Sequence, residues 1–243
     1  MGQTTNSFLI ALNFLTVFNF GKVSFSSLKD VGRSSWAFPL VGIFIGVILV
    51  VAQVIANYFV PLGVAALLTV GVWIFVTGGL HLDGWSDCWD AFGASVSKDR
   101  RLEILKDSRL GSFGAMSLFI LLGLKVSCLS SGLVSYLELI LAAALGRSVL
   151  VICFRHCEHT SPGMAHSFIT GIDSRAYGFM WFALLPVVII CGIDGIISTF
   201  AAIAATFLFK RIAESKLGLI NGDVLGASCE LTETIVLITS CWG

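Results

Sequence analysis

The sequence predicts an all-α fold, a polytopic membrane helical bundle of about six to eight membrane helices. Two features of composition indicate it: 56% of the 243 residues are hydrophobic and only 12% are charged, against roughly one quarter charged in soluble domains. The mean hydropathy is +0.93. A third observation is that apolar runs of bilayer length recur along the whole chain. We therefore expect residues 1–243 to form a single integral membrane domain.

Residues 8–20 are the first apolar stretch, and they are short for a membrane crossing. A full crossing needs about 20 apolar residues. The preceding residues contain neither a basic region nor a small-residue cleavage site, so they do not read as a signal peptide. We interpret this stretch as an interfacial helix or as part of a tilted first helix.

Seven longer apolar runs follow, and each approaches the length of a bilayer core. Helices are expected, because a helix satisfies its own backbone hydrogen bonds in lipid. Pro61 with Gly63, the segment 130–132 and the segment 192–195 supply turns between them. The runs are residues 38–60, 61–80, 110–132, 134–154, 177–193, 195–209 and 224–241.

Lysine and arginine are distributed unevenly between the connections. The connections 21–37, 81–109, 155–176 and 210–223 hold 13 of the 15 basic residues, including Lys22 in the first, whereas the alternate turns hold none. By the positive-inside rule, these four connections face the cytoplasm. We expect an integral protein of the prokaryotic cytoplasmic membrane with its active site on that side.

The two remaining basic residues, Lys125 and Arg147, lie within apolar runs. We interpret Lys125 as snorkelling toward the headgroups, since long side chains near a helix end do this readily. Arg147 is deeper and cannot lose its proton, so it needs a carboxylate, a phosphate or a watery cavity as its partner.

The stretch HLDGWSDCWDAF, residues 81–92, places three aspartates directly after an apolar run. At about 100° per residue, Asp83, Asp87 and Asp90 share one helix face, and the aromatic residues take the other. Like charges one turn apart repel, so a bound cation would explain them, and hard oxygen ligands suit Mg²⁺ or Mn²⁺. The alternative is a solvated interfacial helix. His81 projects toward the aromatic side, and we interpret it as a supporting or structural residue.

A second acidic stripe lies near the C-terminus, in NGDVLGASCELTETIVLI. On a helix that begins at the Asn-Gly turn, Asp223, Glu230 and Glu233 share a face. Both glutamates would then lie inside the last apolar run. We expect them to line a polar cavity with Arg147; the alternative is a purely structural pairing.

Between the two stripes, Lys106 and Arg109 lie about one helical turn apart and flank Asp107. The pair forms a candidate phosphate clamp, because guanidinium matches phosphate oxygens and the glycine that follows lets backbone N–H groups approach. The alternative is a basic loop that only fixes the topology.

Other functions find less support in the composition. A formal net charge of zero argues against nucleic acid as a partner, since binding needs an excess of basic residues on one face. The cysteine count of seven is odd, so we interpret the thiols as reduced. A cluster of Cys153, His156, Cys157 and His159 could be drawn as a zinc site, but it lacks a second ligand pair, and we favour a structural role.

Four blocks occur in a fixed order: FPLVGIFIG, TGGLHLDGWSDCWDAFGA, RRLEILKDSRLGSFGAMSL and NGDVLGASCELTE. Together they resemble the cobalamin synthase family, the adenosylcobinamide-GDP ribazoletransferases, over nearly the whole chain. The resemblance implies a membrane enzyme that uses Mg²⁺. Such an enzyme joins adenosylcobinamide-GDP to α-ribazole or its 5′-phosphate, releases GMP and forms adenosylcobalamin or its phosphate.

The resemblance also implies roles for individual residues. It assigns the metal and pyrophosphate chemistry to Asp83, Asp87 and Asp90, and it adds Asp223 as a catalytic carboxylate. It implies substrate contacts for Lys106, Asp107, Arg109, Glu230 and Glu233, and we also expect Arg147 and Asn221 to contact substrate.

Two positions depart from the family's pattern. Ala91 follows Asp90 where the family usually has glycine, and Asn221 stands where threonine commonly precedes Gly-Asp. Every carboxylate of the pattern is retained. The implied mechanism uses a metal to neutralise the pyrophosphate as GMP leaves, while a carboxylate accepts the proton of the attacking ribose hydroxyl. The sequence does not assign this base.

Two other functional classes remain as alternatives. A phosphotransferase of the CDP-alcohol type also holds metal on an acidic helix, but it expects a longer motif with further Gly-flanked aspartates. A cation transporter would place acids in its membrane helices, but it predicts inverted repeats, and none is visible. Membrane lipid is an expected partner in each case, and the sequence leaves the oligomeric state open, a homo-oligomer included.

Overall fold

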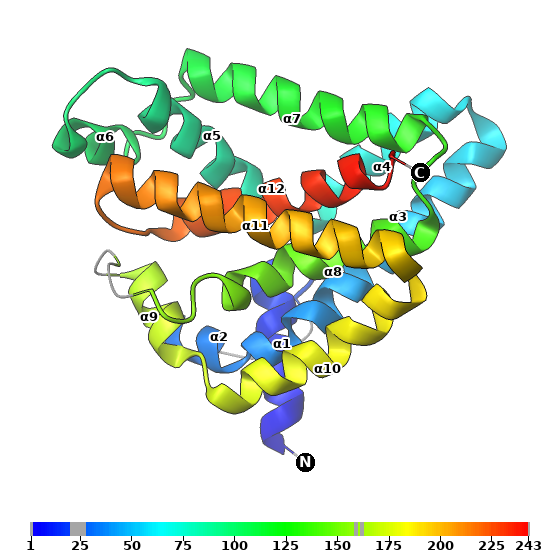
Figure 1. The fold of residues 1–243 in the computed structure, drawn as a ribbon, viewed down its shortest axis with the longest axis horizontal. Coiled ribbons are helices and arrows are strands. Elements are labelled where there is room, and N and C mark those ends of the chain that lie inside the picture. Colours follow the sequence, from blue (N-terminus) through cyan, green and yellow to red (C-terminus); the bar gives the residue numbers. More distant parts are fainter. Residues whose placement is uncertain (1, 20–27, 158–159, 161–162, 243) are drawn as a thin grey trace.

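The computed structural model describes residues 2–19, 28–157, 160 and 163–242, and these form an all-α bundle as predicted (Figure 1). Apart from one bridge between Thr160 and Ile220, the described residues contain no β structure. The helices are α1 (Gly2–Leu15), α2 (Leu28–Arg33), η1 (Ser35–Ala37), α3 (Phe38–Phe59), α4 (Leu62–Thr77), α5 (Leu80–Gly93), α6 (Lys98–Ile104), α7 (Ser112–Ser130), α8 (Tyr136–Ile152), α9 (Met164–Gly171), α10 (Ser174–Ile190), α11 (Gly192–Leu217) and α12 (Gly222–Thr239).

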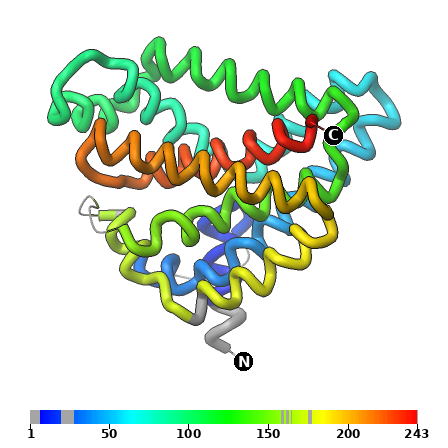
Figure 2. Tube along the Cα trace, in the orientation of Figure 1, coloured from blue at the N-terminus to red at the C-terminus, as the bar shows by residue number. Residues whose placement is uncertain are grey.

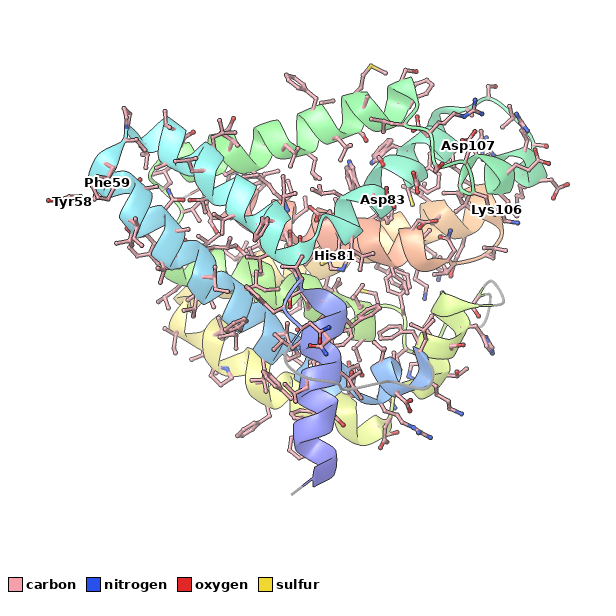
Figure 3. All side chains as sticks on the ribbon, turned by 180° about the vertical axis from the view of Figure 1, so that it is seen from behind. Tyr58, Phe59, His81, Asp83, Lys106 and Asp107 are labelled. Atoms are coloured by element: carbon pink, nitrogen blue, oxygen red, sulfur yellow. The ribbon has the colours of Figure 1, made fainter. Side chains whose placement is uncertain are left out.

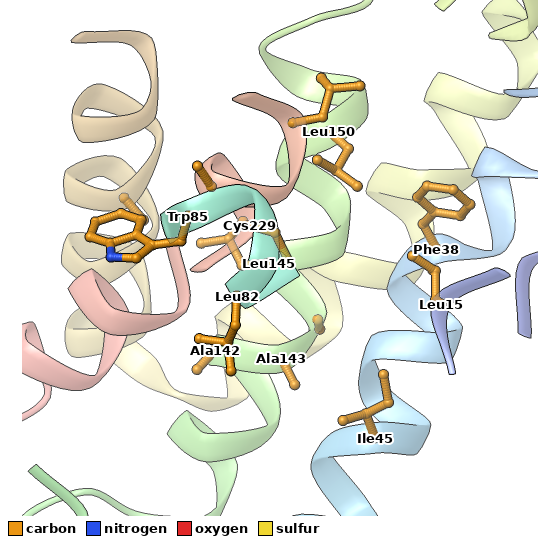
Figure 4. Close-up of a cluster of buried hydrophobic side chains, with 14 of the residues drawn as sticks. Leu15, Phe38, Ile45, Leu82, Trp85, Ala142, Ala143, Leu145, Leu150 and Cys229 are labelled. Atoms are coloured by element: carbon orange, nitrogen blue, oxygen red, sulfur yellow. The ribbon is translucent and has the colours of Figure 1, made fainter. Parts of the chain in front are cut away.

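Helix α8 forms the centre of the bundle, and its residues from Leu141 to Val151 are all buried. Two glycines allow α3 to pack directly on it: a Cβ atom on Gly42 would lie 2.5 Å from the carbonyl oxygen of Ala143, and one on Gly46 would lie 2.6 Å from Cα of Ile140. The side chains between these helices form a continuous hydrophobic core (Figure 4).

The C-terminal helix α12 packs against α5, α7, α8 and α11. In the chain trace it runs through the part of the bundle that α7 and α11 enclose (Figure 2). Most of its side chains are buried, including Glu230 and Glu233. The acidic residues of α12 are therefore held inside the protein.

The bend between α4 and α5 directs the aspartate-rich helix. Gly78 and Gly79 both adopt positive φ angles, 66° and 69°, a conformation that only glycine adopts easily. The axes of α4 and α5 consequently differ by 95°. The apolar run predicted over 61–80 ends here, and α5 leaves it in a new direction.

Two of the four basic connections, 81–109 and 210–223, lie together and apart from the alternate turns. Helix α6 and the C-terminal end of α11 lie at the left of Figure 1, whereas the turns after α3, α7 and α10 lie at the right. A polar contact joins α6 to α11 at that end: Arg101 of α6 donates a hydrogen bond to the carbonyl oxygen of Lys216 at 3.4 Å. Lys22, which belongs to the first basic connection, lies outside the described residues.

By length and composition, three segments of the described chain are apolar enough to cross a membrane: Ser35–Phe59, Ser112–Ser130 and Gly192–Leu217. The bent pair Leu62–Thr77 and Leu80–Gly93 would make a fourth. These findings support a helical membrane protein. They do not establish the larger number of membrane helices expected from the apolar runs, because the other apolar helices are short or carry charge.

Two predicted boundaries were wrong. The run predicted over 195–209 continues as a helix to Leu217, because no helix-breaking residue occurs before Gly218. Lys210 and Lys216 therefore lie on α11, where they donate to the carbonyls of Cys153 and Phe92, both at 3.0 Å. The first helix, expected over 8–20, spans Gly2–Leu15 instead.

Candidate active site

Helix α5 has the two faces that the sequence predicted. Asp83 is exposed and Asp87 and Asp90 are partly exposed, whereas Trp85 and Phe92 are buried. On the aromatic face, the Trp85 ring stacks on Phe209 of α11 with centroids 6.4 Å apart. This packing anchors one side of α5 in the bundle and leaves the carboxylates on the other.

The two acidic stripes meet where α5 crosses the beginning of α12. Gly84 permits the contact, because a Cβ atom there would lie 2.8 Å from the carbonyl oxygen of Asp223 and 2.9 Å from its Cα. Farther along α12, a Cβ on Gly226 would lie 3.3 Å from Cα of His81. Close approach of the two backbones therefore brings Asp83 and Asp223 together.

Asn221 positions Asp223. Its Oδ1 accepts a hydrogen bond from the backbone of Val224 at 3.1 Å and so caps α12, while its Nδ2 donates to Oδ2 of Asp223 at 2.6 Å. Burial raises the pKa of Asp223, the hydrogen bond from Asn221 lowers it, and the charge of Asp83 raises it again, so that the net shift is upward. A carboxyl group in this state is suited to holding or accepting a proton.

Asp90 is placed differently from the other two aspartates of its stripe. Its two carboxylate oxygens accept hydrogen bonds from the backbone N–H groups of Gly111 and Gly114, both at 2.8 Å. Cβ atoms on these glycines would lie within 2.4 Å of the same oxygens. Asp90 therefore ties the start of α7 to α5, and the Gly111 N–H predicted to approach a phosphate is already engaged.

The prediction that Asp83, Asp87 and Asp90 hold Mg²⁺ can be compared with the positions of these carboxylates. Within the described residues, no three His, Cys, Asp or Glu side chains meet closely enough to hold one ion. Mg²⁺ in enzymes is usually bound by one or two carboxylates, with substrate phosphates and water completing its shell. Asp83 and Asp87, one helical turn apart, fit that arrangement, with Asp223 beside them.

The two basic residues of the proposed phosphate clamp do not lie on a helix, although their spacing predicted positions one helical turn apart. Helix α6 ends at Ile104, and Lys106 and Arg109 follow in an exposed loop. Arg109 binds Asp107 through Nη2 at 2.6 Å and Nε at 2.9 Å. The hydrogen bonds from Arg109 lower the pKa of Asp107 to about 2. Figure 3 shows Lys106 and Asp107 well away from His81, which marks the start of α5.

Two glutamates and two basic residues form an ionic network inside the bundle. Lys125 donates to Glu230 at 2.6 Å and also to Glu233, and Arg147 donates to Glu233. The pairing of Arg147 with a glutamate of the last helix is as predicted. The prediction that Lys125 snorkels toward the headgroups was wrong, since its side chain is only 4% exposed. Its face of α7 points at α12, where two acids need a counter-charge. Glu230, Glu233 and Arg147 are thus engaged with protein groups.

The pocket beside the two stripes includes residues that sequence reasoning missed. It has an empty volume of about 820 Å³, partly open to solvent, and it is lined by His81, Asp83 and Asp223 together with apolar side chains. Phe14 of α1 and Phe168 of α9 belong to this lining. No local pattern marked either residue, because each sits in a short apolar segment far from the aspartates in sequence.

The cysteine and histidine cluster does not form a metal centre from its described members. His159 lies outside the described residues, and among the rest no group of three potential ligands gathers. All seven cysteines lie in the described part of the chain, and none of them forms a disulfide bond.

The fold and the pocket together define a helical membrane protein with carboxylates gathered at a partly open cavity. Residues 7–241 match the cobalamin-5-phosphate synthase family, and the chain belongs to this family. Its membership decides against the CDP-alcohol phosphotransferase and transporter alternatives. No solved structure matches the chain.

Proteins named adenosylcobinamide-GDP ribazoletransferase are similar to this chain over most of their length. The protein of Alkaliphilus metalliredigens is 35% identical over 206 residues, covering 83% of this chain and 81% of the relative. The Citrobacter koseri protein is 32% identical over 219 residues, and the Escherichia coli K12 protein is 31% identical over 220 residues; each alignment covers 86% of this chain and 88% of the relative.

Proposed function

We propose that this protein is an adenosylcobinamide-GDP ribazoletransferase. It transfers the adenosylcobinamide phosphate group from its GDP-activated form to α-ribazole or α-ribazole 5′-phosphate and releases GMP. The observation that carries the proposal is the family match over residues 7–241, together with the convergence of Asp83 and Asp223 at one pocket.

The proposed chemistry is distributed over two helices and a loop. Asp83 and Asp87 would hold Mg²⁺, which supplies neutralising charge to the pyrophosphate when bound. Asp223 accepts the proton of the attacking ribose hydroxyl, since its raised pKa makes it a better base than an exposed aspartate. Lys106 and Arg109 contact the phosphates of the donor, with Arg109 exchanging Asp107 for phosphate oxygens.

The proposed location is the prokaryotic cytoplasmic membrane, with six to eight membrane helices and the pocket facing the cytoplasm. Shorter helices such as Tyr136–Ile152 and Ser174–Ile190 would complete crossings by tilting or by local thinning of the bilayer. The gathering of basic residues in alternate connections supports this orientation. Activated nucleotides are also made on the cytoplasmic side.

The proposal is tested by incubating purified protein in lipid nanodiscs with adenosylcobinamide-GDP, α-ribazole and Mg²⁺. We expect equal amounts of GMP and a corrinoid carrying the nucleotide loop, and no product when EDTA removes the metal. Asp83→Asn serves as the control for contaminating activity. Folded wild-type protein that forms no corrinoid product from α-ribazole or its 5′-phosphate would refute the proposal.

A further inference from the structure

Two groups of side chains line the pocket, and the first is an aromatic and aliphatic wall. Phe14, Leu150 and Phe168 contribute to it. Phe38 of the buried core stacks against both phenylalanines, with ring centroids 6.5 Å from Phe14 and 5.7 Å from Phe168. The wall is thus fixed by the core, and its rings present a preformed apolar surface.

The second group is polar and contains Asp83, Asp223 and His81. His81 is only 4% exposed, and its Nδ1 atom has no hydrogen-bond partner among the described residues. Buried polar atoms are nearly always paired, so an unpaired one in a pocket wall is available to a ligand. Among the described lining residues there is no lysine or arginine.

We infer that this pocket is the acceptor subsite and takes an uncharged aromatic nucleoside, which rests on the proposed function. The apolar heterocycle lies against Phe14, Phe168 and Leu150. The ribose lies toward the polar group, so that a hydroxyl can reach Asp223.

The same lining disfavours the other parts of the substrates. A guanine base carries donors and acceptors around its edge, and an apolar wall would leave them unpaired at a considerable free-energy cost. Phosphate groups would find no lysine or arginine among the described lining residues, so we place the donor's pyrophosphate outside the apolar wall, at the metal that Asp83 and Asp87 would hold. A methylated benzimidazole has a single free ring nitrogen, which the unpaired His81 Nδ1 could satisfy.

The test measures both Michaelis constants in Leu150→Ala and Phe14→Ala. We expect the KM for α-ribazole to rise about tenfold, while the KM for adenosylcobinamide-GDP stays within about twofold. The KM for α-ribazole 5′-phosphate should rise by the same factor, since its charged group lies outside this wall. Leu139→Ala is the matched control, because Leu139 lies on the same helix, is 1% exposed against 4% for Leu150, and does not line the pocket.

Equilibrium dialysis with labelled α-ribazole separates this inference from the proposed function. Binding that weakens in both pocket variants but not in Leu139→Ala supports the subsite, even where wild-type protein forms no product. Active protein whose KM for α-ribazole is unchanged in both variants would overturn the inference and leave the proposed function standing. An equal rise in both Michaelis constants would also overturn it, since the pocket would then hold the donor.

Discussion

Replacing Lys125 tests whether the buried ionic network holds the helices together. Lys125 lies on α7, is 3% exposed, and bonds to both Glu230 and Glu233. In Lys125→Met the two glutamates keep only Arg147 as a counter-charge. Removing one partner of a buried ion pair typically destabilises a protein by about 3–5 kcal/mol, because the remaining charge stays buried without compensation. We expect a loss of this size here.

The assay is reversible unfolding in mixed micelles, followed by tryptophan fluorescence and circular dichroism. Arg100→Met is the control, since the side chains of Arg100 and of its ion-pair partner Glu103 are each 63% exposed; an exposed pair of this kind contributes about 1 kcal/mol or less. The double variant Lys125→Met with Glu230→Gln should recover most of the loss, because Arg147 and Glu233 then balance. A loss below about 1 kcal/mol for Lys125→Met would refute the reasoning.

Four further predictions concern the pocket and its orientation. In folded protein, Asp83→Asn should lower turnover at least about a hundredfold, which corresponds to about 3 kcal/mol of activation free energy. A turnover number within threefold of wild type, measured by steady-state kinetics at saturating Mg²⁺, would contradict this. Asp90→Ala should destabilise the protein by about 1–3 kcal/mol in the same unfolding assay, without raising the Mg²⁺ concentration needed for half-maximal activity; a rise in that concentration would contradict this and identify Asp90 as a metal ligand. Because the pKa of Asp223 is raised above 3.8 and its ionised form is the base, activity should fall with decreasing pH before an ordinary aspartate would protonate; a pH–rate profile flat down to pH about 4 would exclude this role. An impermeant maleimide should label Asp99→Cys in inverted but not in right-side-out vesicles.

Local sequence patterns predicted the features that depend on one helix at a time. Hydrophobic runs located the helices, and glycine or proline marked most turns, because both act within a few residues. The spacing of Asp83, Asp87 and Asp90 predicted a shared face for the same reason. The contact of Arg147 with Glu233 also followed, because a charge that lipid cannot solvate must find the opposite charge.

Features that depend on how two helices face each other escaped prediction. Helix α7 is apolar on all sides, so its periodicity did not reveal that Lys125 points at α12. Asp90 binds N–H groups across the connection to α7, and no spacing rule relates those positions. The wall formed by Phe14 and Phe168 joins α1 and α9, which lie far apart in the sequence and both contact α2.

The ionic network and the pocket belong to one helix, which explains why a membrane protein retains charges in its core. Glu230 follows Asp223 by seven residues on α12, a distance of about 10 Å along the axis at 1.5 Å per residue. Rotating α12 by one residue, about 100°, would turn both glutamates away from Lys125 and Arg147. It would also turn Asp223 away from Asp83. Because charged pairs tolerate such a rotation far less than apolar contacts do, we infer that the network fixes the rotation of α12 and so holds Asp223 at the pocket.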